Sequence, residues 1–191
     1  IRGYKYRAYP NKKQKEFFEK TFGCCRFVYN YYLDEKQRLW REWRDTQSYI
    51  QMSKDLSSVL KRKREWLKEA DSIALQQSLR HLDRAYDNFF KKRGGYPKFK
   101  SKRYKQSYRT MNINANISID GDSITLPKAG RVKIVNTRDF DGRIISATVS
   151  RTSSGRYYIS LQVEEEYEDL PNKGGHIGLD AGLKSLYTTS D

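Results

Sequence analysis

The chain has 191 residues, of which 37% are hydrophobic and 32% charged, and its 38 Lys and Arg against 23 Asp and Glu give a formal net charge of +15. This charge favours a polyanionic partner, with nucleic acid the first candidate and an anionic membrane surface the second. No run of about 18 apolar residues could span a bilayer and no secretory leader is recognisable, while the adjacent Cys24 and Cys25 indicate a reduced, cytoplasmic protein.

The first 44 residues predict one strand followed by two helices. Residues 1–9 alternate and are rich in Tyr and Arg, which is typical of a strand, and Pro10 ends it. Asn11 is a suitable helix N-cap before the apolar stripe of Phe17, Phe18 and Phe22. We expect Gly23 to interrupt the helix and a second helix to run from about Cys24 to Arg44.

Two further helices are expected before residue 92. Ser53 should open a short one, and Asp71 should cap the strongest one, over residues 72–92. Gln76 and Arg80 lie on the polar face of that helix, where Gln and Arg side chains can read base edges in a groove. A solvated face explains the same spacing. His81, beside them, belongs to no recognisable catalytic triad and is interpreted as structural or phosphate-facing.

Residues 91–109 contain nine cations and no acid. Gly94, Gly95 and Pro97 exclude a continuous helix, and four aromatic residues are interleaved with the cations. We expect this stretch to contact a nucleic-acid backbone, because each such contact releases counterions; the alternative is a solvated basic loop. The nine residues are Lys91, Lys92, Arg93, Lys98, Lys100, Lys102, Arg103, Lys105 and Arg109.

The pattern from residue 113 onwards is that of a β structure. Residues 113–119 alternate as a strand, residues 120–122 form a turn, and two strands at 144–150 and 156–163 form a hairpin about Gly155. Five or six short strands suggest a small barrel, which residues 1–9 complete, with the helices as an insertion. An acidic linker ends this region, and Pro171 and Gly174-Gly175 mark a boundary.

Asp180 follows the short apolar segment Ile177-Gly178-Leu179. Spacing alone favours a turn residue. As a metal ligand, this carboxylate would need acidic partners, and no suitable ones follow in the last eleven residues. We therefore expect the chain, which begins at Ile1, to be the front of a larger protein.

Several segments in this order and spacing resemble the TnpB family, transposon-encoded RNA-guided nucleases related to type V CRISPR effectors. The resemblance covers nearly the whole chain. Its segments are Tyr4-Lys5-Tyr6-Arg7-Ala8-Tyr9-Pro10-Asn11, Gly23-Cys24-Cys25-Arg26-Phe27-Val28-Tyr29-Asn30, Ala74-Leu75-Gln76-Gln77-Ser78-Leu79, Ala85-Tyr86-Asp87-Asn88-Phe89-Phe90, Gly95-Tyr96-Pro97-Lys98-Phe99-Lys100, Ser107-Tyr108-Arg109-Thr110, Leu126-Pro127-Lys128 and Ile177-Gly178-Leu179-Asp180-Ala181-Gly182-Leu183.

The resemblance implies an α+β fold in three parts. Residues 1–10 and 101–170 would form a small antiparallel wedge β-barrel, residues 11–100 an inserted helical recognition lobe, and residues 174–191 the first strands of a RuvC-like domain of RNase H fold. The implied partners are a guide RNA and a double-stranded DNA target. The protein would read a short motif beside the target, and base pairing with the guide would read the remaining sequence. No Gly-rich phosphate loop is present, and we expect no nucleotide cofactor.

The resemblance also implies roles for individual residues. Contacts to the DNA motif map onto Tyr49, Ser72, Ile73, Gln76, Ile113 and Asn114, to which the helix face adds Arg80. Ser72 and Ile113 differ from the basic or hydroxyl residues of relatives, which implies a different motif.

Asp180 matches the first carboxylate of a two-Mg²⁺ nuclease site, and zinc is expected only in a C-terminal module outside this chain. By itself the chain should not cut DNA. A nuclease-inactive guided repressor is the alternative, and a nucleic-acid-binding protein without a guide is the third hypothesis.

Overall fold

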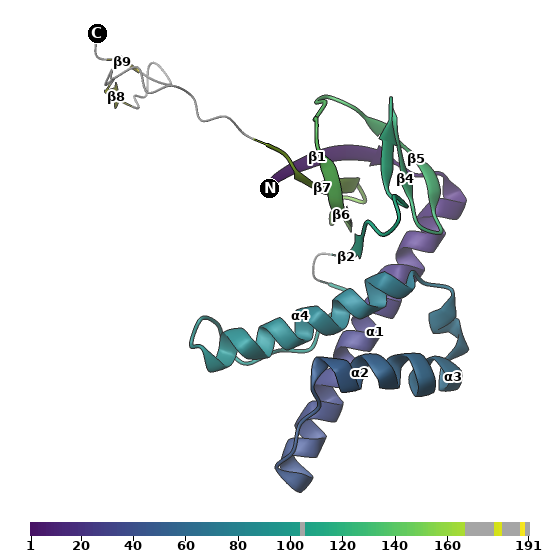
Figure 1. Ribbon diagram of the computed structural model, residues 1–191, viewed down its shortest axis with the longest axis vertical. Coiled ribbons are helices and arrows are strands. Elements are labelled where there is room, and N and C mark those ends of the chain that lie inside the picture. Colours follow the sequence, from purple (N-terminus) through teal and green to yellow (C-terminus); the bar gives the residue numbers. More distant parts are fainter. Residues whose placement is uncertain (104–105, 167–177, 181–187, 190–191) are drawn as a thin grey trace.

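The computed structural model describes residues 1–103, 106–166, 178–180 and 188–189, and of residues 179–180 and 188–189 only the backbone. Its architecture is α+β, with four helices and two short helical turns inserted between the first strand and the rest of an antiparallel sheet (Figure 1). Within the part described, no helix is long and apolar enough to span a membrane.

Strand β1 (Arg2–Tyr9) leads into α1 (Lys12–Trp43), a continuous helix of 32 residues. Asn11 caps it as expected, since its side chain accepts a hydrogen bond from the backbone N–H of Gln14 and the Gln14 side chain accepts one from the Asn11 N–H. The expected interruption at Gly23 is wrong. One glycine disfavours a helix by only about 1 kcal/mol, and the neighbouring Phe22 and Cys24 are buried in the core.

The second half of the helical region differs in its boundaries from the prediction. Ser48, not Ser53, caps α2 (Tyr49–Asp55), because its side chain accepts from the N–H of Gln51 in a capping box. The π-helical turn η1 (Leu56–Leu60), α3 (Lys61–Lys63) and the 3-10 turn η2 (Glu65–Lys68) follow. Asp71 caps α4 (Ser72–Phe90) as expected, through the N–H of Ile73.

The remaining strands form one seven-stranded sheet. They are β2 (Gln106–Met111), β3 (Ser118–Asp120), β4 (Ser123–Leu126), β5 (Gly130–Val135), β6 (Arg143–Arg151) and β7 (Tyr157–Glu164), in the order β2-β6-β7-β1-β5-β4-β3. The hairpin about Gly155 is confirmed, as is the turn at Gly121. β1 pairs with both β7 and β5, so the first strand joins the two parts of the later β region.

The sheet is not closed into a barrel, contrary to expectation, because β2 and β3 are its two edges. It is nevertheless strongly curved. Seven flat strands would place the edges about 29 Å apart, whereas the six residues 112–117 between β2 and β3 can span at most about 25 Å. The loop 112–117 connects β2 to β3 in place of the direct pairing of these strands that would close a barrel.

The predicted strand over residues 113–119 is also wrong. Its first half is the loop 112–117, in which Asn114 and Ala115 have positive φ angles of 53° and 56°. Its last residues enter the short β3. The Asn112 side chain holds the loop: its amide donates to the Ile144 carbonyl at 2.9 Å, and its oxygen accepts from the Ile117 N–H at 3.0 Å. These side-chain bonds replace a strand ladder and place Ile113 at the surface.

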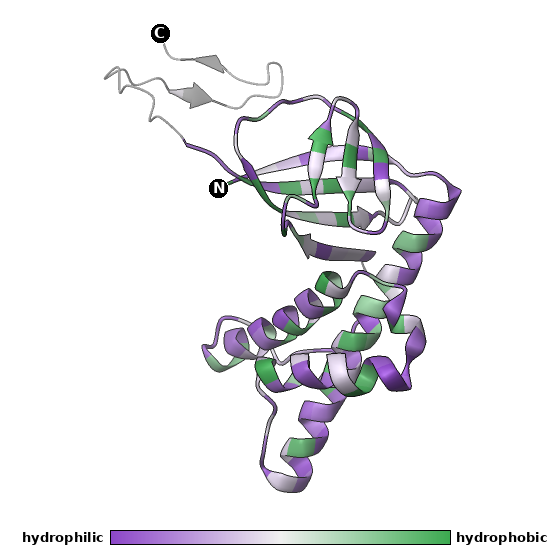
Figure 2. Ribbon diagram, turned by 45° about the vertical axis from the view of Figure 1, so that its right-hand side comes forward, coloured by the Kyte–Doolittle hydropathy of each residue, from purple (hydrophilic) through white to green (hydrophobic). Residues whose placement is uncertain are grey.

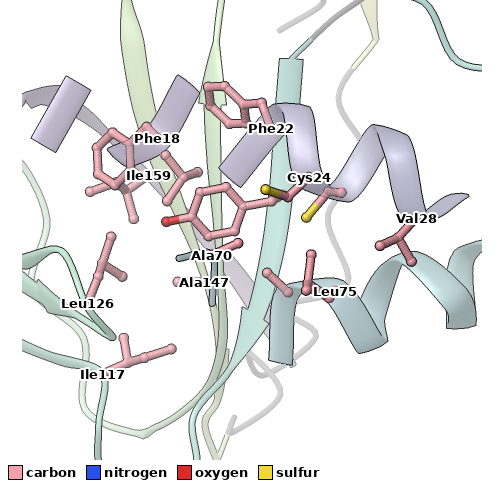
Figure 3. Close-up of a cluster of buried hydrophobic side chains, with 14 of the residues drawn as sticks. Phe18, Phe22, Cys24, Val28, Ala70, Leu75, Ile117, Leu126, Ala147 and Ile159 are labelled. Carbon is pink, nitrogen blue, oxygen red and sulfur yellow. The ribbon is translucent and has the colours of Figure 1, made fainter. Parts of the chain in front are cut away.

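Helices and sheet share a single hydrophobic core. Phe18 and Phe22 of α1 lie 6.2 and 5.7 Å, centre to centre, from the Tyr108 ring of β2. Figure 3 shows Phe18 of α1 beside Ile159 of the sheet, whereas Leu75 of α4 lies toward Val28, further along α1. Figure 2 shows the matching pattern of alternating hydropathy along the strands and apolar stripes along the helices. The helical surface is therefore held in a fixed position against the sheet.

Candidate nucleic-acid interface

The first part of the candidate interface lies where the start of α2 meets α4. Ile73, Gln76 and Arg80 are spaced by three and four residues, which places them on one face of α4. The Arg80 guanidinium carbon lies 4.4 Å from the centre of the Tyr49 ring. This cation–π contact joins two residues that sequence analysis predicted from separate segments.

Ser72 and Gln76 differ in how much their side chains are already engaged. The Ser72 hydroxyl accepts a hydrogen bond from Lys61 Nζ at 3.0 Å. The half-buried Gln76 side chain has no hydrogen bond within the described residues, so its amide can both donate to and accept from a ligand.

Ile113 and Asn114 lie on the loop 112–117 and have no direct contact with the α4 group among the bonds of the described residues. Their loop is fixed internally, since the Ile113 N–H donates to the Asn116 side chain at 3.0 Å. Ile113 is 49% exposed, which leaves an apolar side chain available at the tip. The structure thus presents the predicted DNA-binding residues as two separate elements.

The basic stretch of residues 91–109 is divided by the structure. Lys91 forms an ion pair with Asp87, one turn earlier in α4, at 2.8 Å. Lys105 lies outside the described residues. The exposed members outside the cleft described next, without an ion pair in the part described, are Lys92, Arg93, Lys98, Lys102 and Arg103.

Lys100 and Arg109 instead line a cleft of about 270 Å³ between α1, α4, residues 99–101 and β2. Asn30 of α1 fixes the Lys100 backbone: its oxygen accepts from the Lys100 N–H at 2.8 Å, and its amide donates to the Lys100 carbonyl at 2.9 Å. The Lys100 ammonium lies 4.0 Å from the centre of the Tyr29 ring. Arg109 donates to Ser146 Oγ at 3.1 Å and to Gln162 Oε1.

Sequence analysis missed Arg26 and Phe99 as members of this cleft. Arg26 donates to Gln106 Oε1 at 2.8 Å across 80 residues of sequence. Phe99 is 51% exposed beside it. Their positions depend on contacts between α1 and β2 that no local pattern reveals.

The ionisable groups of the cleft are partly desolvated, and no acid among the described residues of its lining offsets their positive charge. Desolvation, followed by Lys100, Arg109 and Arg84, lowers the pKa of His81 to about 4, so that His81 is neutral at pH 7. Desolvation likewise lowers the pKa of the Lys100 ammonium, and desolvation and Arg84 lower that of Arg109. Arg26, Lys100 and Arg109 form no ion pair with a carboxylate of the described residues. The described lining of the cleft therefore carries cations and no acid.

Asp180 is described by its backbone alone. It ends β8 (Leu179–Asp180), which pairs antiparallel with β9 (Thr188–Thr189), with Asp180 opposite Thr188. In the part of the chain that the structure describes, no three or more His, Cys, Asp or Glu side chains are grouped to hold a metal ion. The residues present therefore do not make up a complete metal site.

Comparison with known proteins gives two matches over nearly the whole chain. The chain is 35% identical over 192 residues to a "Putative RNA-guided DNA endonuclease" of Streptomyces pristinaespiralis, covering 99% of this chain and 48% of the relative. It is 33% identical over 196 residues to the "Putative RNA-guided DNA endonuclease InsQ" of Escherichia coli K12, covering 100% and 48%. The chain belongs to the TnpB family.

Two further matches concern parts of this TnpB-family chain. It is 36% identical over 112 residues to the virulence protein VsdF of Salmonella dublin, covering 53% of the chain and 94% of that protein. A family profile described as a helix-turn-helix domain matches residues 1–45. In the structure these residues form β1 and the single helix α1, without a turn between two helices. The chain spans about half the length of its two endonuclease relatives.

Sequence analysis also missed a polar face of the TnpB-family sheet. Lys5 and Arg7 alternate along β1 and point to the same side as Tyr158 of β7. The Lys5 ammonium and the Arg7 guanidinium carbon lie 4.6 and 5.2 Å from the Tyr158 ring centre. Arg7 also donates to the Tyr158 hydroxyl at 3.3 Å and lowers its pKa. The spacing of Lys5 and Arg7 by two residues within the predicted strand could have indicated this polar face.

Proposed function

We propose that the protein containing this chain is an RNA-guided DNA endonuclease of a transposon, and that this chain binds the guide RNA and the target-adjacent DNA motif. The observation that carries the proposal is the identity of 33–35% over nearly the whole chain to two relatives that bear this name. A net charge of +15 supports two polyanionic partners.

The α4 face is the proposed reader of the DNA motif. Gln76 can form a bidentate pair with an adenine edge in the major groove, and Arg80, held over Tyr49, can contact a guanine edge or a phosphate. Ser72 and Ile73 flank this position at the start of α4. The exposed Ile113 can contact a thymine methyl group, with Asn114 beside it. Each role is consistent with the chemistry of the side chain.

The exposed cations at and after the end of α4 are the proposed contacts to RNA or DNA phosphates. Lys92, Arg93, Lys98, Lys102 and Arg103 have no carboxylate partner in the part described, so phosphates meet no competing ion pair there. Lys105 is proposed for the same role from the sequence alone. Lys91 should contribute less, since Asp87 already pairs with it.

Asp180 is proposed as one carboxylate ligand of a two-Mg²⁺ nuclease site, whose ions would activate the attacking water and stabilise the leaving oxygen. Its place at the end of a short paired strand supports the role. Because the described residues do not complete such a site, the other ligands would come from the remainder of the full-length protein. Zinc is proposed only for that remainder.

The decisive test is plasmid cleavage by the full-length protein purified with its native RNA, in Mg²⁺, on a guide-matched target flanked by a randomised motif. Asp180→Ala should abolish cutting and leave RNA and DNA binding nearly unchanged. Binding that depends on the guide without any cutting by the unmodified protein would indicate a guided repressor. Binding that ignores the guide would exclude both functions.

A second variant pair tests the reading of the motif. Gln76→Ala should weaken binding to the motif duplex by about 5- to 150-fold, the range for one bidentate base contact. Gln77→Ala is the matched control, because it removes the same amide from the next position, about 100° around the helix. Equal losses of affinity in the two variants would show that other residues recognise the motif.

A further inference from the structure

The cleft between α1, α4 and β2 has a composition that the core of the fold does not require. Arg26, Lys100 and Arg109 approach it from three different segments, and no acid among the described residues lines it. His81 and the ring of Phe99 complete its wall. Cations that only increase solubility are usually separated from one another on the surface, whereas Arg26, Lys100 and Arg109 line the same cleft.

This gathering is unfavourable without a ligand. Desolvation lowers the pKa of Lys100 and of Arg109, and desolvation followed by the neighbouring cations lowers the pKa of His81. Hydrogen bonds from neighbouring residues nevertheless hold the three cationic residues at the cleft. Asn30 fixes the Lys100 backbone, Gln106 accepts from Arg26, and Ser146 accepts from Arg109. The guanidinium groups of Arg26 and Arg109 are thus held by side chains and Lys100 by its backbone, which preorganises the three residues for an anion.

The dimensions and the aromatic wall limit what the anion is. A volume of about 270 Å³ lies near the lower end of small-molecule sites, which begin at about 300 Å³, so the cleft excludes a duplex. The exposed face of Phe99 suits a flat base, as aromatic side chains do in single-strand-binding proteins. Neutral His81 can donate or accept a hydrogen bond at a base edge or a phosphate.

We propose that this cleft binds one nucleotide of a single-stranded nucleic acid, with its phosphate at Arg26, Lys100 and Arg109 and its base against Phe99. The proposal rests on the proposed nucleic-acid-binding function and adds to it a discrete pocket for an unpaired nucleotide. Within the basic stretch it separates Lys100 and Arg109, which line the cleft and recognise one nucleotide, from the cations outside the cleft, which contact the nucleic-acid backbone.

Affinity is measured with the full chain and a short single-stranded oligonucleotide by fluorescence anisotropy. Lys100→Gln should lower affinity about tenfold or more, because it removes a charged hydrogen-bond donor from a partly desolvated site. Phe99→Ala should lower it by about 5- to 100-fold through lost stacking. Lys98→Gln, an equal charge change two residues away and outside the cleft, should have a clearly smaller effect. Phe99 is exposed, so its variant is expected to fold even if Lys100→Gln does not.

The His81 imidazole gives a second readout by NMR. Replacing His176 with Gln leaves His81 as the sole histidine, and the oligonucleotide should shift its signal and raise its pKa, since a phosphate counteracts the surrounding cations. The shift should be lost in Lys100→Gln and kept in Lys98→Gln.

Three outcomes would overturn the proposal. The oligonucleotide could bind while the His81 signal stays unmoved, or Lys98→Gln could weaken binding as much as Lys100→Gln. Inorganic phosphate or adenosine monophosphate could also move the signal as strongly as the oligonucleotide, which would make the cleft a site for free anions. Absence of any oligonucleotide binding by the unmodified chain would instead count against the proposed function itself.

Discussion

Individual polar side chains determine where the cations of this chain lie. Asn30 on α1 makes two hydrogen bonds to the backbone of Lys100, 70 residues away, and so turns one member of the basic stretch toward the cleft. Arg26 is oriented by Gln106 in the same way. Single amide groups thus fix the positions of two cationic residues that line the cleft.

The first prediction concerns the neutral His81. Its pKa is lowered from 6.5 to about 4 in the fold, so between these pH values the unfolded chain binds a proton that the folded chain does not. The contribution of His81 to stability is therefore fully present above about pH 6.5 and is lost as the pH falls toward 4. At about 1.4 kcal/mol for each pKa unit, the contribution of His81 is at most about 3.5 kcal/mol, and it is smaller in practice because the imidazole is only partly buried.

Urea unfolding at pH 7 and pH 5 measures this effect. The unmodified chain should lose more free energy of unfolding between the two pH values than His81→Gln does. All other ionisable groups are the same in the two proteins, so only the difference between them reports on His81. Equal losses would show that burial and the neighbouring Lys100, Arg109 and Arg84 do not disfavour protonation of His81.

At the scale of the elements, α1 connects the sheet to the other helices. Its first half packs on the sheet through Phe18, whose ring lies 6.0 Å from that of Tyr157. Gln14 donates to the carbonyls of Ala129 and Arg131 at 3.1 and 2.7 Å. Its later half packs on α4 (Figure 1). An uninterrupted α1 is therefore needed for a fixed geometry between the motif-reading face and the sheet.

The second prediction tests this continuity. Gly23→Ala should raise the free energy of unfolding by about 0.5–1 kcal/mol, because alanine favours a helix interior and the new methyl group meets only the tip of the Arg26 side chain, at 4.0 Å. A helix break at Gly23 would give the opposite sign. Gly142→Ala is the contrasting case: its methyl group would lie 2.5 Å from the Glu164 carbonyl oxygen, and the variant should be destabilised. Both are measured by urea unfolding.

At the scale of the whole molecule, the net charge of +15 is distributed unevenly. Acids neutralise cations at many points of the helices, including Lys20 by Glu69 and Arg38 by Glu35. The turn after α4 and the segment 98–103 keep cations without such partners in the part described. These cations beside α4, next to the cleft, are therefore available to attract a polyanion.

The third prediction compares two adjacent lysines in this field. Lys92→Gln should reduce the slope of log affinity against log salt by about 0.7–0.9, the value for one lost phosphate contact. Lys91→Gln should change the slope less, because Asp87 already pairs with Lys91. Oligonucleotide binding at several salt concentrations measures both slopes. A larger change for Lys91 would mean that its ion pair opens in the complex.

The sequence by itself determined what depends on neighbours along the chain. The caps at Asn11 and Asp71, the stripe of α4, the Gly155 hairpin and the basic character of residues 91–109 were all predictable, because each arises from side chains a few residues apart. The family was also predictable from the order of its segments. Gln76 and Arg80 could be assigned to one helix face for the same reason.

Only the tertiary structure decided the features that depend on distant contacts. Burial of Phe22 and Cys24 outweighed the local preference of Gly23. The Asn112 bonds made a loop of an alternating segment and left the sheet open between β2 and β3. The cleft arose from pairs 70 and 80 residues apart, Asn30 with Lys100 and Arg26 with Gln106. Such pairs leave no periodic signal, because burial and long-range hydrogen bonds form only once the chain has folded.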